Sequence, residues 1–189
     1  MIVSRKVWVW WSLFFVMGGL LVSCGEGEAE PAATPVPEVS LGTVEMAVDA
    51  VSGGAVDATR TVTGTSPFEV DVVIVSTTEG YQGYQYKLGW DEAVLAYDSQ
   101  TDLKPADLDL CATPTIRGST VYGGCVRVSD NTSFTGPVNT LTLHCVSKGT
   151  SPLHLMSRTE DPHFGSGALG FTGVSIPTTL TDASVTCAD

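Results

Sequence analysis

Basic residues are scarce in this 189-residue chain, and several patterns that mark common function classes are missing. Nine Lys and Arg stand against 21 Asp and Glu, so the formal net charge is −12 and no basic stripe forms. Nucleic-acid binding needs cations that neutralise phosphates, so we expect no nucleic-acid partner. The sequence has no G-x-S-x-G elbow, no Cys-x-x-Cys and no ligand spacing among its histidines. We therefore expect no enzyme activity, metal or cofactor.

A sustained helical period of apolar residues is also missing, and short apolar runs separated by Gly, Pro, Asp and Ser begin near residue 39. The clearest run is "FEVDVVIVS" (68–76), in which Phe68, Val70, Val72 and Ile74 share one face. Further strands are predicted over 43–51, 81–90, 93–97, 119–129, 138–147, 151–157 and 183–188. Eight or nine strands at this spacing predict an all-β domain, a β-sandwich or jelly roll, over residues 39–189.

The amino terminus has the layout of a secretory signal peptide over residues 1–23. Arg5 and Lys6 precede an apolar core that runs from Val7 to Val22, and small Ser23 stands before Cys24. The stretch "LVSC" resembles the bacterial lipobox, which implies that Cys24 receives a diacylglyceryl thioether and becomes the acylated first residue. The alternative is an uncleaved membrane helix with a buried thiol, although the apolar core is short for a span.

Residues 24–38 read "CGEGEAEPAATPVPE", an acidic, proline-bearing stretch without aromatics. Such a segment cannot bury enough apolar surface to fold, so it is predicted to be an extended tether. The acyl chains on Cys24 would hold this tether at a membrane. The sequence therefore predicts an extracytoplasmic, membrane-anchored lipoprotein of the bacterial cell envelope.

Four cysteines remain once Cys24 is set aside, an even number that suits disulfides in an oxidising compartment. Three pairings are open. Alternation places Cys145 and Cys187 on the inward faces of their strands, whereas Cys125 is out of phase with neighbouring valines and is expected to face outward, towards a loop that carries Cys111. This pattern favours Cys111–Cys125 and Cys145–Cys187.

Two stretches resemble cohesin modules. "FEVDVVIVSTTEGYQGYQYKLGWDEAVLAYDS" (68–99) is similar to their first half, in which a strand and a turn lead into a strand that ends in an aromatic–Asp pair. "NTLTLHCVSKGTSPLHLMS" (139–157) is similar to a later strand, a Thr-Ser-Pro turn and another strand, and "TDASVTCAD" resembles the last strand. The resemblance covers roughly residues 40–189, and the lipobox and the four cysteines depart from scaffold-type cohesins.

This resemblance implies a nine-stranded jelly-roll sandwich without a catalytic centre that serves as a receptor for dockerin modules, in which the dockerin holds the calcium. If the family's binding mode carries over, the contacts would lie on the central part of 68–76 and on 81–90. The fold is also close to carbohydrate-binding modules, so a polysaccharide is the alternative partner. A third alternative is a passive adhesive or structural domain.

Trp90, Tyr84 and Tyr86 are the candidate ligand-binding residues for a glycan, because alternation puts the three rings on one face and Tyr81 on the other. The competing interpretation packs Trp90 at the sandwich edge and lays both tyrosines over a sheet. The acidic stretch 98–109 spaces Asp98, Gln100, Asp102 and Asp109 much like a calcium loop. Leu103 stands where that loop needs glycine, so a solvated acidic loop is expected there.

Overall fold

The structure is a computed structural model that describes residues 41–170 and 173–189. The predicted signal peptide, Cys24 and the tether lie outside these residues. Every regular element in the described part is a β-strand, and no helix there is long and apolar enough to cross a membrane. The strands are β1 (Val44–Asp49), β2 (Thr59–Thr63), β3 (Phe68–Thr77), β4 (Gly83–Gly89), β5 (Leu95–Asp102), β6 (Leu110–Arg117), β7 (Thr120–Val126), β8 (Gly136–Cys145), β9 (Gly149–Leu155), β10 (Gly167–Leu169), β11 (Ser175–Ile176), β12 (Thr178–Thr181) and β13 (Ala183–Ala188).

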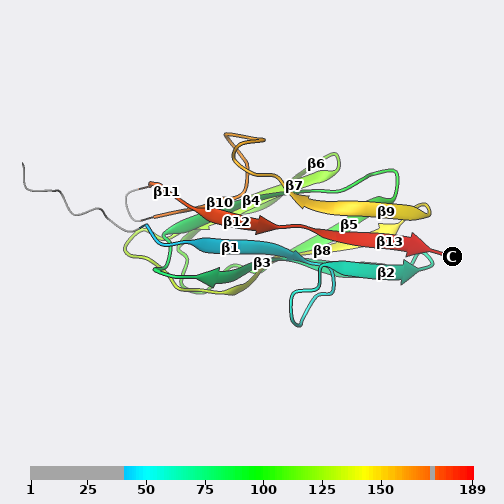
Figure 1. The fold of residues 1–189 in the computed structure, drawn as a ribbon, viewed down its shortest axis with the longest axis horizontal. Coiled ribbons are helices and arrows are strands. Elements are labelled where there is room, and N and C mark those ends of the chain that lie inside the picture. The colour runs from blue at the N-terminus through cyan, green and yellow to red at the C-terminus, as the bar shows by residue number, and fades with distance from the viewer. Residues whose placement is uncertain (1–40, 171–172) are drawn as a thin grey trace, which may run out of the picture. The chain divides into compact units, whose positions relative to one another are not determined.

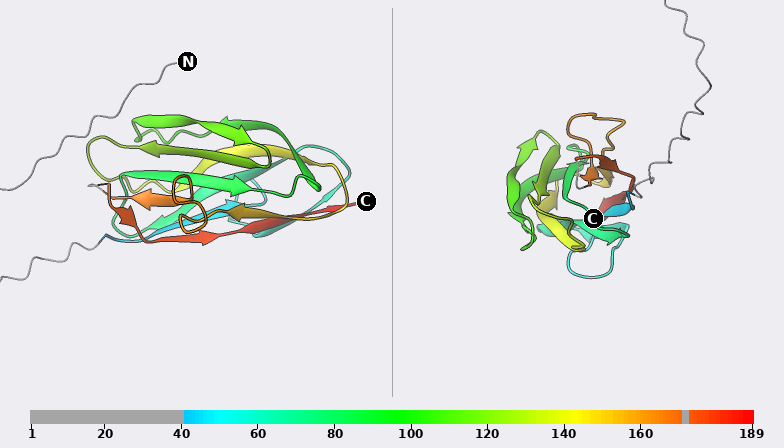
Figure 2. Two further views of the ribbon diagram at one scale, coloured as in Figure 1. Left: turned by 90° about the horizontal axis from the view of Figure 1, so that it is seen from above. Right: turned by 90° about the vertical axis from the view of Figure 1, so that its left-hand side faces the viewer.

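The strands form two sheets that pack face to face (Figures 1 and 2). One sheet has the order β12-β1-β3-β8-β5, and the other has the order β11-β10-β4-β9-β13-β2. In the second sheet β7 pairs with the free side of β4, and β6 pairs with β7. This arrangement is the all-β sandwich that the sequence predicts.

The hydrophobic core lies between the two sheets and follows the alternation of the sequence. On β3, Phe68, Val70, Val72 and Ile74 are all buried, as predicted for one face of that strand. The facing sheet contributes Leu88, Leu153 and Val185, among others. Burial of such side chains stabilises the fold by about 1.5–3 kcal/mol each, before conformational entropy is subtracted.

Residues 41–170 and 173–189 form thirteen strands instead of about nine, and two of the additional strands, β2 and β12, arise because the chain changes sheets near both ends of the domain. β1 pairs with β3 and β12, whereas the next strand, β2, pairs in parallel with β13 in the other sheet. β12 and β13 divide in the same way. The threonine-rich sequences of β2 and β12 carry almost no apolar alternation, so no strand was predicted there.

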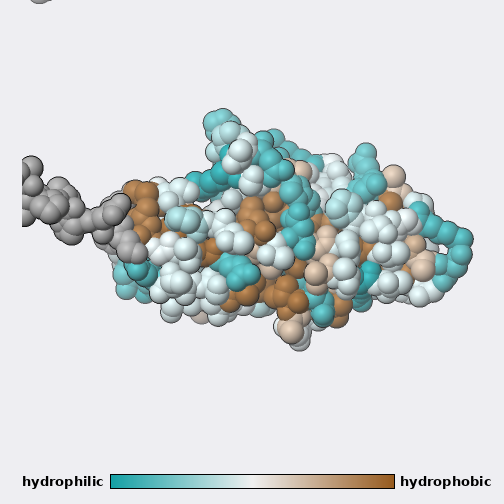
Figure 3. Space-filling model, viewed as in Figure 1, coloured by the Kyte–Doolittle hydropathy of each residue, from teal (hydrophilic) through white to brown (hydrophobic). Residues whose placement is uncertain are grey.

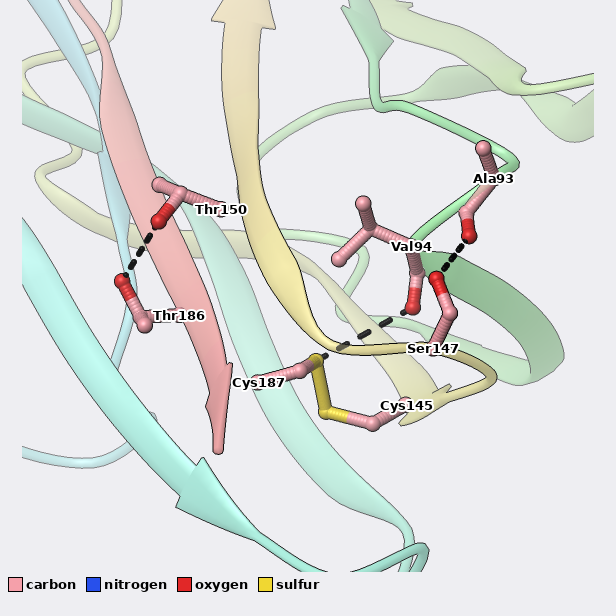
Figure 4. Close-up of a disulfide and its surroundings, with 7 residues drawn as sticks. All are labelled: Ala93, Val94, Cys145, Ser147, Thr150, Thr186 and Cys187. Atoms are coloured by element: carbon pink, nitrogen blue, oxygen red, sulfur yellow. Dashed lines mark hydrogen bonds between the residues drawn. A yellow bond between two sulfur atoms is a disulfide. The ribbon is translucent and has the colours of Figure 1, made fainter. Parts of the chain in front are cut away.

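Two disulfides join Cys111 to Cys125 and Cys145 to Cys187, the pairing that alternation favoured. The second bridge links β8 in one sheet to β13 in the other (Figure 4). Both of its cysteines are buried in the core. The first bridge links β6 to the neighbouring β7, where the two cysteines are register partners.

The predicted orientation of Cys125 is wrong, since Cys125 is buried while Val126 and Val128 are exposed. Cys111 also lies in a strand and not in a loop. Alternation shows which residues share a face, but it does not show which of the two faces meets the core.

Candidate functional site

The outer face of β4, β7 and β6 carries an apolar hollow with a volume of about 380 Å³. These three strands lie side by side in antiparallel register, with Tyr86 opposite Gly123 and Cys125 opposite Cys111 (Figure 2). The hollow lies between the free edge strand β6 and the loop 157–165, which follows β9 and carries Phe164. Its lining is mostly apolar and includes Leu110, Ala112, Tyr122, Gly124, Val126 and Phe164.

Glycines form the floor of the hollow because neighbouring atoms leave no room for side chains. A Cβ on Gly124 would lie 2.5 Å from the carbonyl oxygen of Tyr84, and one on Gly123 would lie 2.7 Å from the Tyr86 hydroxyl. Gly124 therefore lets β4 and β7 approach closely and leaves the outer surface above them concave, whereas Gly123 makes room for the buried ring of Tyr86 on the core side.

Exposed apolar side chains form the walls. Leu110 is 62% exposed and lies opposite Val126, which is also exposed, on the paired strands β6 and β7. Phe164 is 50% exposed and packs against Tyr122, with ring centroids 5.3 Å apart and planes tilted by 42°. Contiguous apolar groups that remain exposed on a folded domain commonly mark an interaction site.

Polar contacts to β4 hold the loop that carries Phe164. Lys87 donates from Nζ to Asp161 Oδ2 at 2.8 Å, and Asp161 Oδ1 accepts the backbone N–H groups of His163 and Phe164. The Lys87 ammonium and these N–H groups lower the pKa of Asp161 to about 2, so its carboxylate stays charged at neutral pH. Gln85 Nε2 donates to the carbonyl of Gly165 at 2.7 Å. The aromatic wall is thus fixed by a charged pair and an amide.

Trp90, Tyr84 and Tyr86 do not form an exposed glycan platform. All three side chains are buried, and even Trp90 is only 7% exposed and stacks on Tyr97 with centroids 6.4 Å apart. Tyr81, expected on the opposite face, is buried as well, because it precedes β4 and does not follow that strand's alternation. Burial raises the pKa of Tyr84 and Tyr86. The packing interpretation of these rings is the one that the structure supports.

The two segments expected to carry the partner contacts lie in different sheets. β3, which contains residues 68–76, belongs to the sheet opposite the hollow, so it cannot share a docking face with β4. Partner contacts on β3 stay a prediction that this geometry does not test. For 81–90 the outer face of β4 does line the hollow, through Gln85.

His154 lies between two carboxylates on the surface. Its Nδ1 is 2.6 Å from Asp182 Oδ2, and its Nε2 is 2.9 Å from Glu160 Oε1. Hydrogen bonds to Asp182 and then to Glu160 raise the pKa of His154. Ser157 Oγ donates to Glu160 and not to His154. With both ring nitrogens engaged by carboxylates, His154 has no free nitrogen to accept the proton of a serine nucleophile.

The carboxylates of the acidic stretch 98–109 point to separate partners. Asp98 Oδ1 pairs with His144 Nδ1 at 2.9 Å, and Asp109 Oδ2 accepts the N–H of Val128. Burial raises the pKa of Asp102. Across residues 41–170 and 173–189, no group of three or more His, Cys, Asp or Glu side chains could hold a metal ion.

Sequence reasoning did not single out Leu110, Tyr122 or Phe164. Phe164 lies about forty positions along the chain from Tyr122, within the sequence "DPHFGSG", which has no strand period. The one local signal was the pair Gly123–Gly124 inside a strand pattern, since glycine in a strand interior often marks a close backbone approach. The meeting of these side chains depends on strand pairing.

No known protein-family profile matches the chain, and no curated protein matches it. Solved structures of cohesin modules do match its fold. A type III cohesin module from the cell-surface anchoring scaffoldin of Ruminococcus flavefaciens aligns with a TM-score of 0.60 at 9% identity, over 79% of this chain and 90% of that one. A non-cellulosomal cohesin from the archaeon Archaeoglobus fulgidus gives 0.55 at 11% identity, over 78% and 92%.

A type I cohesin–dockerin complex from Clostridium thermocellum aligns with a TM-score of 0.55 at 12% identity, over 77% of this chain and 95% of that one. At such low identity the likeness speaks for the fold alone. The two-sheet architecture and these alignments together show that the described domain has a cohesin-like β-sandwich fold.

Proposed function

We propose that the domain is a non-enzymatic recognition module that binds a dockerin-type protein module through the hollow on β4, β7 and β6. The observation that carries the proposal is the exposed apolar lining of this hollow on a chain of net charge −12. An exposed leucine and an exposed phenylalanine on its opposite walls favour a partner that brings its own apolar side chains.

Binding would bury these walls and leave a polar rim. Leu110 and Phe164 would supply most of the binding energy, because large apolar groups at the centre of an interface contribute most. Lys87, Asp161 and Gln85 would act by positioning, since they fix the loop that carries Phe164. Strand β4 is central in its sheet, so this face is supported on both sides by paired strands.

The dockerin class is preferred because several of the cohesin structures with this fold were solved in complex with dockerins. A polysaccharide is the weaker alternative, since the three rings expected to stack on sugars are buried. Passive adhesion would leave the apolar hollow without a role.

A lipid on Cys24 would hold the module at a bacterial membrane, with residues 24–38 as the extended tether between them. The two disulfides support an extracytoplasmic site, where such bonds persist. Intact mass spectrometry of the protein purified from its native membrane tests this part alone. Acylation at Cys24 supports the anchor, and an unmodified Cys24 contradicts it without affecting the proposed docking face.

The docking proposal is tested by capture from the secreted proteins of the native organism, with a glycan array probed in parallel. The baits are the wild-type chain, Leu110→Asp, Phe164→Asp and the control Val146→Asp, which places the same charge on an exposed valine outside the hollow. Each change in the hollow should cost at least about 2 kcal/mol of binding free energy, or roughly thirtyfold in affinity.

Support requires a captured protein with a duplicated calcium-loop repeat whose binding needs calcium, is lost in both hollow variants and survives in Val146→Asp. Calcium dependence is expected because the loops of a dockerin require the ion to fold. Capture that is equal for all four baits would contradict the hollow as the site. Glycan binding without protein capture would favour the polysaccharide alternative.

A further inference from the structure

A second hollow, lined by both polar and apolar groups, lies beside the start of the loop 157–165. It has a volume of about 390 Å³ and is bounded by Ser157 to Thr159, by Ser166 and Gly167, and by the segment from Ser175 to Leu180. Its distinguishing feature is a cation among hydroxyl groups: the side chain of Arg158 beside Ser157, Thr159, Ser166, Ser175 and Thr178.

Arg158 differs from the other arginines of the described residues. Arg60 donates to the carbonyls of Ala50 and Glu69, Arg127 pairs with Asp107 and Asp130, and the guanidinium of Arg117 lies over the ring of Tyr122. Within residues 41–170 and 173–189, Arg158 has no carboxylate partner, and its Nε is fully buried without an acceptor. Because the Nε is covered, a ligand in the hollow would meet the terminal Nη groups, and no hydrogen bond or ion pair joins these groups to the described residues.

Gly167 provides the space for the guanidinium. A Cβ on Gly167 would lie 3.0 Å from Arg158 Nε and 3.4 Å from its Cδ, so a side chain there would require the arginine to shift by a few tenths of an ångström. Gly167 is buried in the short strand β10, where a side chain would normally strengthen the strand. Glycine at this position leaves room for the Arg158 side chain, although it contributes no side chain to the packing of the strand.

The surrounding contacts leave the guanidinium available. The adjacent carboxylate, Glu160, accepts hydrogen bonds from the backbone N–H and the hydroxyl of Ser157 and lies 2.9 Å from His154 Nε2. Asp161 is engaged by Lys87. Both carboxylates have their pKa lowered to about 2 by these contacts, so they remain charged and committed to their own partners.

We infer that the hollow at Arg158 is a binding site for an oxyanion, the carboxylate, sulfate or phosphate group of a small ligand. The planar guanidinium offers donors in a fork that matches two oxygens of such a group. The hydroxyls of Ser175 and Thr159 line the same hollow and supply neutral donors. This site is separate from the apolar hollow on β4, β7 and β6, and it does not depend on the proposed docking function.

The test uses the folded chain and three probes, sodium phosphate, sodium sulfate and sodium acetate, each titrated at constant ionic strength against chloride. Nuclear magnetic resonance follows the Nε–Hε signal of Arg158 and the backbone amide signals of Gly167 and Ser175. We expect at least one probe to shift these signals saturably. Arg158→Gln should weaken that binding about tenfold or more, because a charge-assisted hydrogen bond is lost.

Arg117→Gln is the matched control, since it removes the same charge from an arginine outside the hollow. Its affinity should stay within about twofold of wild type, because distant surface charges are screened. Arg158→Lys keeps the charge but loses the planar fork, so it should bind with intermediate affinity. The inference is overturned if no probe gives a saturable shift in the wild-type protein. Equal affinities of wild type and folded Arg158→Gln would overturn it as well.

Discussion

The two disulfides of this domain lie in contrasting settings. Cys145–Cys187 joins the two sheets through the core, and it closes a chain separation of 42 residues. Cys111–Cys125 joins two neighbouring strands of one sheet, closes a separation of 14 residues and lies beneath the apolar hollow, which Cys125 helps to line. The Cys145–Cys187 bridge therefore holds the two sheets together, whereas the Cys111–Cys125 bridge holds edge strand β6 in register beside the proposed docking face.

Removal of the inter-sheet bridge should have the largest effect on stability. In the chain-entropy description, Cys145→Ser with Cys187→Ser lowers the free energy of unfolding by about 4 kcal/mol, because the unfolded chain regains a long loop. The midpoint of thermal unfolding should fall by about 10 °C. Partner capture at a temperature where the variant stays folded should match wild type. Weaker capture at that temperature would contradict the proposal that the inter-sheet bridge stabilises the fold without shaping the docking face.

Removal of the cross-strand bridge should lower the free energy of unfolding less than removal of the inter-sheet bridge, but it should weaken partner binding more. The Cys111–Cys125 bridge closes a shorter loop, so we expect Cys111→Ser with Cys125→Ser to lower the free energy of unfolding in denaturant by about 3 kcal/mol. β6 is an edge strand paired only with β7, so without the bridge Leu110 loses its fixed place in the wall. Capture by this variant should weaken relative to the inter-sheet variant. Equal capture by both variants would show that pairing alone holds β6.

The ion pairs of His154 with Asp182 and Glu160 lie on the surface, so we expect a smaller effect from them than from either disulfide. The carboxylates raise the pKa of His154 in the folded domain above its ordinary value of 6.5. Its stabilisation is therefore fully present below the unfolded pKa and is lost as pH rises through the folded pKa. Melting curves of wild type and His154→Gln should differ at acidic pH and converge at alkaline pH, with His163→Gln as the control.

The smallest effect is expected for a hydroxyl pair beside the inter-sheet bridge. Thr150 Oγ1 and Thr186 Oγ1 lie 3.0 Å apart where β9 pairs with β13 (Figure 4). The face of the domain drawn in Figure 3 is mostly of intermediate to low hydropathy, with scattered hydrophobic patches. Thr186→Val should change the free energy of unfolding by no more than about 0.5 kcal/mol, since surface substitutions rarely do more. A loss near that of the cysteine pair would mean that the hydroxyls stabilise this end of the sandwich as much as the bridge does.

Much of the fold could be predicted from local patterns. Period-two alternation placed Phe68, Val70, Val72 and Ile74 in the core, and it put Cys145 and Cys187 on inward faces. The resemblance to cohesins pointed to the sandwich. The same rule failed for Cys125, because alternation is symmetric and the valines beside it face solvent.

The sequence by itself determined an acidic all-β domain with a core of alternating residues and four cysteines besides Cys24, because each of these is written in composition or in near-neighbour spacing. Only the tertiary structure decided which strands share a sheet. It brought Leu110 beside Val126 and Phe164 beside Tyr122, and it placed the guanidinium of Arg158 over Gly167. These contacts join residues up to about forty positions apart, so strand pairing and sheet order set them, and no local spacing could.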